Sequence, residues 1–292
     1  MKSRPIRVHL GDIDAIKLGM HRFDLRDPYY IVLTISWPMF FALAVSFYLT
    51  ANLCFALAYF AVPGCINNAR PGVFLDHFFF SIETLATVGY GVMSPANIYG
   101  HIVASTEIIF GLMSMAVITG LVFTRFSRPR SRLMFSRVAV VGPYDEYNAL
   151  MLRVVNERHG TVAEASARLT LLRRTHLPNG KILRRFIDLQ LERPSTPVIS
   201  LSWNLIHRID EQSPFWGTTA ADLERDGGML IASIKGYDES ISASVVARQT
   251  YPARNVLFDH EFIDVVDQLP TGEVVLDVAR FHDAVPVVRA IT

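Results

Sequence analysis

The chain has 292 residues, of which 51% are hydrophobic, and its formal net charge is only +1. Its mean hydropathy of +0.29 is high for a soluble protein of this size, and a nearly neutral chain gives no reason to expect a nucleic-acid partner. The apolar content is concentrated in the first 125 residues, which predicts a membrane part followed by a soluble part. Cys54 and Cys65 do not indicate a disulfide framework and are interpreted as small apolar residues.

The N-terminal residues 1–30 are predicted to lie in the cytoplasm and to include a helix at the membrane interface. Residues 1–19 are polar and basic, and no apolar core follows them at the distance expected of a secretory signal. Residues 20–30 mix charges with Phe23, Leu25 and two tyrosines, which is typical of an interfacial helix. A solvated linker is the alternative interpretation.

Two segments are long enough to cross a membrane, which takes about 20 apolar residues. Residues 31–62 carry no charge and are predicted as an outer helix; residues 101–125 are predicted as an inner helix. Residues 74–86, between them, are apolar but too short to span. We predict a re-entrant pore helix there, which is tolerated only when it is buried in protein or lines a cavity. These segments form a pore domain over residues 31–125.

The pore helix leads into Thr87, Val88, Gly89, Tyr90 and Gly91, the sequence TVGYG, which is the known selectivity filter of potassium channels. Aiming successive carbonyls at one axis requires alternating backbone dihedrals, and Gly89 and Gly91 adopt positive φ at little cost. The carbonyls of residues 87–90, with the Thr87 hydroxyl, can then replace the water shell of K⁺. The negative C-terminal end of the pore helix also favours a cation. Taken alone, the five residues could equally be an ordinary glycine turn.

The distribution of basic residues predicts how the two spans are oriented in the membrane. They precede the first span and follow the second at Arg125, Arg128, Arg130 and Arg132, whereas the intervening loops hold only Arg70. The positive-inside rule therefore places both termini in the cytoplasm. The arginine cluster also suits anionic lipid headgroups, although topology anchoring alone would explain it.

After a linker at residues 126–137, the pattern changes to short strands over residues 138–292. Strand-like runs occur at residues 149–155, 167–173, 198–209, 229–234, 241–249 and 274–278, and Pro178-Asn179-Gly180 suits a hairpin turn. This pattern predicts an antiparallel immunoglobulin-like β-sandwich. The histidines lack metal-ligand spacing, and no phosphate-binding loop or nucleophile elbow is present in the sequence, so neither enzymatic activity nor a resident cofactor is expected.

Three stretches together resemble the bacterial inward-rectifier potassium channels: FFFSIETLATVGYG at residues 78–91, GLVFTRFSRP at 120–129 and SLSWNLIHRIDEQSPFWG at 200–217. The resemblance runs from about Asp27 to the C-terminus. It implies a homotetramer around a fourfold axis, K⁺ as the permeant ion, a cytoplasmic domain that extends the pore, and regulation by phosphoinositide or other anionic lipids at the arginine cluster. The compact outer loop and the lack of a cysteine after the filter favour a prokaryotic plasma membrane.

Residues Gly111, Met115, Thr119 and Phe123 recur every four positions and share one helix face. The resemblance implies that this face lines the cavity and that Phe123 forms a gate that closes by dewetting. Gly111 or Gly120 could be the hinge; packing of small residues between helices is the alternative. Met115 stands where strong rectifiers carry an acidic residue, so strong polyamine block is not expected.

Two carboxylates, Glu83 and Glu107, lie within the membrane part, where charge is costly enough to imply a partner or a role. We expect both behind the filter, hydrogen-bonded to its backbone as supports. The sequence thus predicts a tetrameric, passive, K⁺-selective channel. The alternatives are a membrane-anchored β-sandwich receptor or interaction protein, a weakly selective cation channel, and a membrane-bound enzyme, for which no catalytic constellation is found.

Overall fold

The computed structural model describes residues 6–10, 13–17, 27–129, 131–158, 160–176 and 180–287. The chain divides into two compact units, His21–Arg128 and Met1–Met20 with Pro129–Thr292. The expected domain limits at residues 30, 125 and 137 stay predictions.

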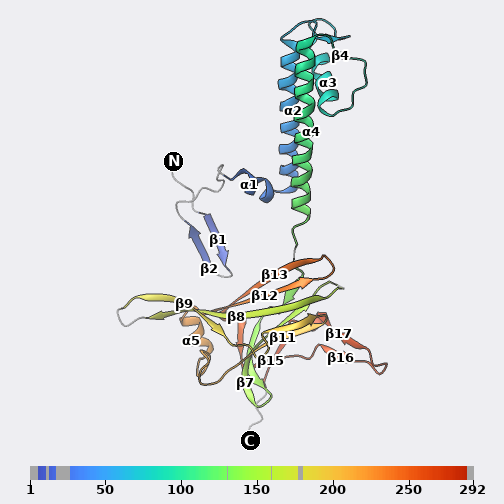
Figure 1. Ribbon diagram of the computed structural model, residues 1–292. Helices are drawn as coiled ribbons and strands as arrows, with labels where there is room; N and C mark the ends of the chain where they lie inside the picture. The colour runs from blue at the N-terminus through green and yellow to red at the C-terminus, as the bar shows by residue number, and fades with distance from the viewer. Residues whose placement is uncertain are drawn as a thin grey trace. The chain divides into compact units, whose positions relative to one another are not determined.

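The first unit is helical. It contains α1 (Pro28–Thr34), α2 (Trp37–Phe60), α3 (Phe74–Leu85) and α4 (Ile98–Phe126), with a short pairing of β3 (Ile66–Asn67) and β4 (Ser94–Pro95). α2 and α4 are long and apolar enough to cross a membrane. The short α3 lies beside them at one end (Figure 1), where the re-entrant helix was expected.

The outer helix differs from the predicted residues 31–62, because the structure breaks it at Ile35 and Ser36. Both residues are extended, with ψ near 159° and 156°, and α2 begins afresh at Trp37. Pro38 explains the break, because in a continuous helix it would have no N–H for the Thr34 carbonyl and its ring would clash with that carbonyl, whereas a proline is tolerated in the first turn of α2. The interfacial helix is described only from Pro28, because residues 18–26 lie outside the described ranges.

Arg125, near the end of α4, occupies this break. Its guanidinium donates to the Val32 carbonyl and, at 2.7 Å, to the Ile35 carbonyl. It also lies over the Trp37 ring, 4.5 Å from the centroid. Arg125 therefore satisfies carbonyls that a continuous helix would have paired internally.

The second unit is a β-sandwich, as predicted. One five-stranded sheet has the order β10 (Ser195–Ile199), β8 (Val162–His176), β12 (Met229–Asp238), β13 (Ala243–Pro252), with β9 (Ile182–Leu189) also on β8. The other has the order β11 (Ser202–Arg208), β7 (Tyr147–Asn156), β6 (Ala139–Tyr144), β14 (Val256–Phe258), with β5 (Leu133–Phe135) on β7. The two sheets enclose one core that includes Leu152, Leu169, Trp203, Leu230 and Tyr251.

Smaller elements complete this unit. They are the hairpin of β1 (Ile6–Leu10) and β2 (Ile13–Lys17), α5 (Ala220–Arg225), the pair β15 (His260–Phe262) and β18 (Ala284–Pro286), and the pair β16 (Val266–Gln268) and β17 (Val274–Leu276). The β1–β2 hairpin was not anticipated from the polar N-terminus. The run predicted at residues 198–209 is wrong as one strand, because the chain passes from one sheet to the other at the exposed Ser200 and Leu201.

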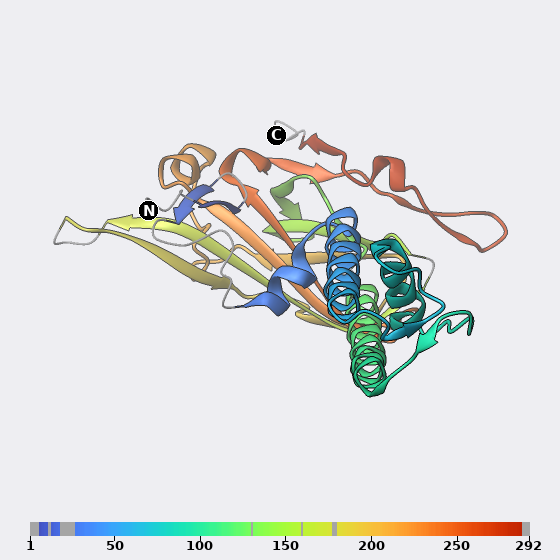
Figure 2. The ribbon, with the colours of Figure 1, turned by 90° about the horizontal axis from the view of Figure 1, so that it is seen from above.

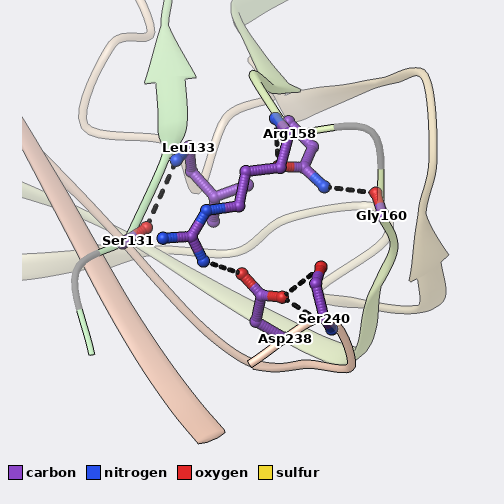
Figure 3. Close-up of polar contacts among 7 residues, drawn as sticks. Ser131, Leu133, Arg158, Gly160, Asp238 and Ser240 are labelled. Carbon is purple, nitrogen blue, oxygen red and sulfur yellow. Dashed lines mark hydrogen bonds and ion pairs between the residues drawn. The ribbon is translucent and has the colours of Figure 1, made fainter. Parts of the chain in front are cut away.

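A partly buried ion pair joins the β7–β8 loop to the β12–β13 turn (Figure 3). The Arg158 guanidinium donates to Asp238 at 2.6 Å, and the Ser240 hydroxyl and N–H donate to the same carboxylate at 2.8 and 3.0 Å. Burial acts to raise the pKa of Asp238, but the hydrogen bonds from Ser240 and Arg158 together outweigh it, so the pKa lies below its usual range.

Candidate functional site

The end of α3 holds the start of the filter. The Glu83 carbonyl accepts the Val88 N–H at 2.8 Å and the Gly89 N–H at 3.4 Å, and the Thr84 carbonyl accepts the Thr87 N–H at 3.0 Å. The filter therefore continues directly from the last turn of α3. The negative end of the helix dipole lies at this junction, where a cation is favoured.

The filter backbone alternates in the sign of φ. Thr87, Gly89 and Gly91 have φ of 57°, 58° and 81°, whereas Val88 and Tyr90 are not in the positive region. The sequence predicted this for the two glycines and missed Thr87, a β-branched residue for which positive φ is a strained outlier. Residue type gives no signal for it. The alternation is the pattern that turns successive carbonyls to one side of the chain.

A buried polar cluster behind α3 connects three helices. The Tyr59 hydroxyl of α2 donates to one Glu107 oxygen at 2.6 Å, and the Ser81 hydroxyl of α3 donates to the other. Ser81 also lies 3.1 Å from the Asn52 side-chain oxygen. All four residues are completely buried. The cluster fixes α2, α3 and α4 against one another, because a buried acceptor without its donor is costly.

The expectation that Glu107 bonds the filter backbone is therefore wrong. Glu107 lies opposite Ser81, six residues before Thr87, whereas Gly111, one turn further along α4, lies opposite Leu85. Sequence reasoning missed Tyr59, Ser81 and Asn52. The available signal was the isolated Asn52 in an uncharged span, since polar groups at membrane depth need partners.

Glu83 supports the filter through its backbone carbonyl, whereas the sequence predicted that its side-chain carboxylate would do so. Its backbone carbonyl accepts both filter N–H groups. Among the described residues its carboxylate has no hydrogen-bond partner, and it is half-exposed in the single chain. Within one chain the Glu83 side chain does not reach the filter backbone, and the expected contact stays a prediction for the assembled protein.

Gly111 packs against α3, unlike the other three residues of α4 that the sequence placed on the cavity-lining face with it. A Cβ at Gly111 would press on the Leu85 carbonyl oxygen, with the Leu85 Cδ1 at 3.2 Å. Gly111 is thus a close-packing position against α3, one of the alternatives that the sequence left open. Met115, Thr119 and Phe123 are exposed in the single chain, and a Cβ at Gly120 would meet open space.

The predicted arginine cluster is divided. Arg125 is engaged at the α1–α2 break, and Arg128 is exposed in the same unit. Arg130 lies outside the described residues. Arg132 belongs to the other unit, where it lies 3.9 Å from Glu157 in an exposed ion pair.

The loops flanking the filter are tied by specific contacts. Arg70 forms a two-point contact with Asp76 of α3, at 2.9 and 2.7 Å, and its N–H donates to the same carboxylate. The Asn68 side chain donates to the Val92 carbonyl, just past the filter, at 2.7 Å. The outer end of the filter is therefore anchored to the loop that enters α3.

Known proteins are similar to both units. The family model described as the C-terminal domain of inward rectifier potassium channels matches residues 133–291, and the one described as ion channel matches residues 31–128. The inward rectifier potassium channel Kirbac3.1 of Paramagnetospirillum magnetotacticum is 36% identical over 274 residues, covering 94% of this chain and 93% of that one.

Mammalian channels are similar over a shorter region. The mouse G protein-activated inward rectifier potassium channel 4 and the human channel 3 are each 32% identical over 228 residues, or 75% of this chain. The match covers 54% and 57% of those chains. All of these relatives are ion channels by name. With its two apolar helices, its short helix leading into TVGYG and its β-sandwich, this membrane protein belongs to the inward rectifier potassium channel family.

Proposed function

We propose that four copies of the chain form a K⁺-selective channel whose filter is residues 87–91. The alternating φ at Thr87, Gly89 and Gly91, placed at the C-terminal end of α3, carries the proposal. Carbonyls of residues 87–90 and the Thr87 hydroxyl would coordinate K⁺ in stacked rings. One chain supplies one wall of such a site. Val88 and Tyr90, 50% and 73% exposed in the single chain, would pack against neighbouring copies.

The gate would lie at the inner end of α4. Met115, Thr119 and Phe123 are spaced four residues apart on exposed helix, and the Phe123 ring is 72% exposed in the single chain. Four such rings around an axis would exclude water, and dewetting closes a pore without any charge. Gly120, with open space around it, would allow α4 to bend.

Anionic lipid would act at the inner membrane surface. Arg128, Arg130 and Arg132 are the candidate headgroup contacts, each worth about 1 kcal/mol near an anionic surface. Arg125 would act differently, by holding α1 to the end of α4 through the Val32 and Ile35 carbonyls. Movement of α1 at the interface would thereby reach the gate. Both termini would be cytoplasmic in a cell membrane.

The experiment is ⁸⁶Rb⁺ uptake into liposomes that contain the purified protein, driven by a K⁺ gradient. Uptake that barium blocks and excess Na⁺ does not reduce would support a selective pore. Uptake that Na⁺ also reduces would indicate a weakly selective channel. Phe123→Ala serves as the opened control: if it is also silent, and native mass spectrometry finds a monomer, the receptor interpretation replaces the channel.

A further inference from the structure

A small pocket lies beside the β8–β9 hairpin of the β-sandwich unit. Both views show this hairpin projecting past α5 at one end of the unit (Figures 1 and 2). The pocket has a volume of about 180 Å³ and is lined by Leu172, Arg173 and Arg174 of β8, Arg184 of β9, and Gly227, which follows α5. Three of its five lining residues are therefore arginines.

Backbone contacts hold the walls of the pocket in place. β12 pairs with β8 only as far as Leu172, so beyond this residue β8 and β9 form a two-stranded ribbon. The chain just before β12 stays beside β8, because the Arg174 N–H donates to the Asp226 carbonyl at 3.0 Å. Arg174 is directly opposite Arg184 in the ribbon, so their side chains leave it on the same face.

Gly227 leaves room for the Arg174 side chain. Its φ is 57°, and a Cβ there would lie 2.7 Å from a terminal nitrogen of Arg174 and 2.9 Å from its Nε. The guanidinium therefore lies against the Gly227 backbone, and a larger residue would displace it. A side chain that is already held in this way loses less conformational freedom when a ligand binds.

The pocket has an excess of positive charge. No Asp or Glu occurs between Glu164 and Asp188, so the ribbon itself carries no carboxylate. Among the described residues, none of the three pocket arginines forms an ion pair. The carboxylate of Asp226, next to Gly227 in the chain, is paired with Arg225 at 3.5 Å. Like charges directly opposite one another destabilise a ribbon, so an anion bound here would stabilise it.

The chemistry of the pocket favours a phosphate group over other anions. A guanidinium presents planar pairs of N–H donors, which match phosphate oxygens two at a time. A phosphate monoester has three acceptor oxygens and a charge of about −1.5 to −2 at pH 7, so it can bind two guanidinium groups at once. A carboxylate has only two coplanar oxygens and one charge. The volume of about 180 Å³ is more than ten times the ~10–15 Å³ that one water needs, so a phosphate group fits.

We propose that this pocket is a binding site for a phosphate group, held by the guanidinium groups of Arg174 and Arg184. Bound phosphate bridges β8 and β9 and, through Arg174, reaches the turn between α5 and β12. The group can belong to a soluble anion or to a lipid headgroup, because the recognised chemistry is the same. The site is separate from the arginines at the inner end of α4 and does not depend on the channel proposal.

The test is isothermal titration calorimetry of the full-length protein in phosphatidylcholine nanodiscs, with sodium pyrophosphate as the probe. The wild type should bind pyrophosphate, and Arg184→Gln should weaken binding about 10- to 100-fold, the loss expected for one charged hydrogen-bonding partner. Arg184→Lys keeps the charge but lacks the planar fork, so it should also bind more weakly than the wild type. Absence of binding to the wild type, or equal affinity in Arg184→Gln, would overturn the proposal.

Arg185→Gln is the matched control. Arg185 is the next residue of β9, so its side chain lies on the opposite face of the ribbon, and it does not line the pocket. The affinity of this variant should change by less than about threefold, because exposed charges are screened over about 8 Å at physiological ionic strength. An equal loss in both variants would mean that the ribbon attracts anions only by its net charge, and would overturn the pocket.

Thermal unfolding gives a second readout, in which charge and ligand act in opposite directions. Without an anion, Arg184→Gln should melt at or above the wild type, because it removes the like charge opposite Arg174. Pyrophosphate should raise the melting temperature of the wild type but not that of the variant. The same shift in both proteins would contradict the site.

Nanodiscs that contain phosphatidic acid identify the source of the phosphate group. If its headgroup occupies the pocket, pyrophosphate should bind severalfold more weakly than in nanodiscs with phosphatidylglycerol, an anionic lipid whose phosphate is a diester. That result would support the site and assign it to lipid phosphate. Equal affinity in the two kinds of nanodisc, with the loss in Arg184→Gln retained, would support the site and assign it to a soluble phosphate.

Discussion

Gly111→Ala should damage the pore, whereas Gly120→Ala should not. Gly111 lies against the last turn of α3, where a new Cβ would press on the Leu85 carbonyl oxygen and come within 3.3 Å of its carbonyl carbon. Backbone atoms cannot rotate away as a side chain can. Either α4 or the end of α3 must therefore shift, and Leu85 is only two residues from Thr87.

The expected difference in the free energy of unfolding between the two variants follows from two opposing effects. Alanine is favoured over glycine in a helix by about 1 kcal/mol, and both variants gain this. Overpacking costs about 1–3 kcal/mol and applies only at Gly111, because a Cβ at Gly120 has nothing within 4 Å. Gly111→Ala should consequently be less stable than Gly120→Ala by about 1–3 kcal/mol.

Thermal unfolding in detergent and ⁸⁶Rb⁺ uptake are the two measurements. Gly111→Ala should melt below Gly120→Ala and lose K⁺ flux, while Gly120→Ala should melt at or above the wild type. A change only in the opening of Gly120→Ala would fit its proposed role as hinge. The packing argument is refuted if both variants melt at the same temperature and Gly111→Ala conducts normally.

Four further predictions follow from the same contacts. Gly89→Ala should abolish selectivity or conduction, because alanine resists a φ of 58°; a K⁺ over Na⁺ preference retained in flux assays would contradict this. Phe123→Ala should leak when the wild type is closed, and an unchanged resting ⁸⁶Rb⁺ flux would argue against the gate. Glu107→Gln should keep the fold, since an amide can still bond both hydroxyls, whereas Glu107→Leu should lower the melting temperature; equal melting would count against the cluster. Asp238→Asn should cost about 2 kcal/mol at pH 7, below the 3–5 kcal/mol typical of a fully buried pair because Arg158 is 27% exposed. Since the folded pKa of Asp238 lies below the unfolded value, its contribution is full above about pH 4 and is lost as pH falls through the folded pKa, so the variant's deficit should shrink in acid when unfolding is followed against pH.

The elements that sequence patterns predicted well are those with a strong physical signal. A long uncharged run, a short apolar segment before TVGYG and alternating strands each require one kind of structure, and the two spanning helices, α3 and the sandwich are confirmed. The break at Ile35 and Ser36 could also have been predicted, since a proline at position 38 is tolerated in the first turn of a helix but breaks a helix that continues through it. The uncharged, apolar composition of residues 31–62 favoured one continuous helix despite that local signal.

The details of the candidate site were less predictable. The buried polar cluster depends on which faces of α2, α3 and α4 meet. The amino-acid sequence alone does not specify how these helices are rotated against one another. Gly111 illustrates the limit: its four-residue spacing from Met115 placed it on the cavity face, but a helix face is wide and the Leu85 carbonyl lies at its edge. The positive φ at Thr87 has no residue-level signal at all.

The contacts of α4 divide the helix into a packed outer part and an exposed inner part, which have different structural roles. Its buried residues are Gly100, Ala104, Glu107 and Gly111, all in the outer part that packs on α3 and on the loops around Cys65 and Pro95. Past Gly111, the described helix has no buried residue, although Arg125 still binds the α1–α2 break. A bend at Gly111 itself would disturb Leu85 and with it the filter. A bend at Gly120 would move Phe123 while leaving the Glu107 cluster intact, so the packing favours Gly120 as the hinge and predicts that opening leaves the filter support unchanged.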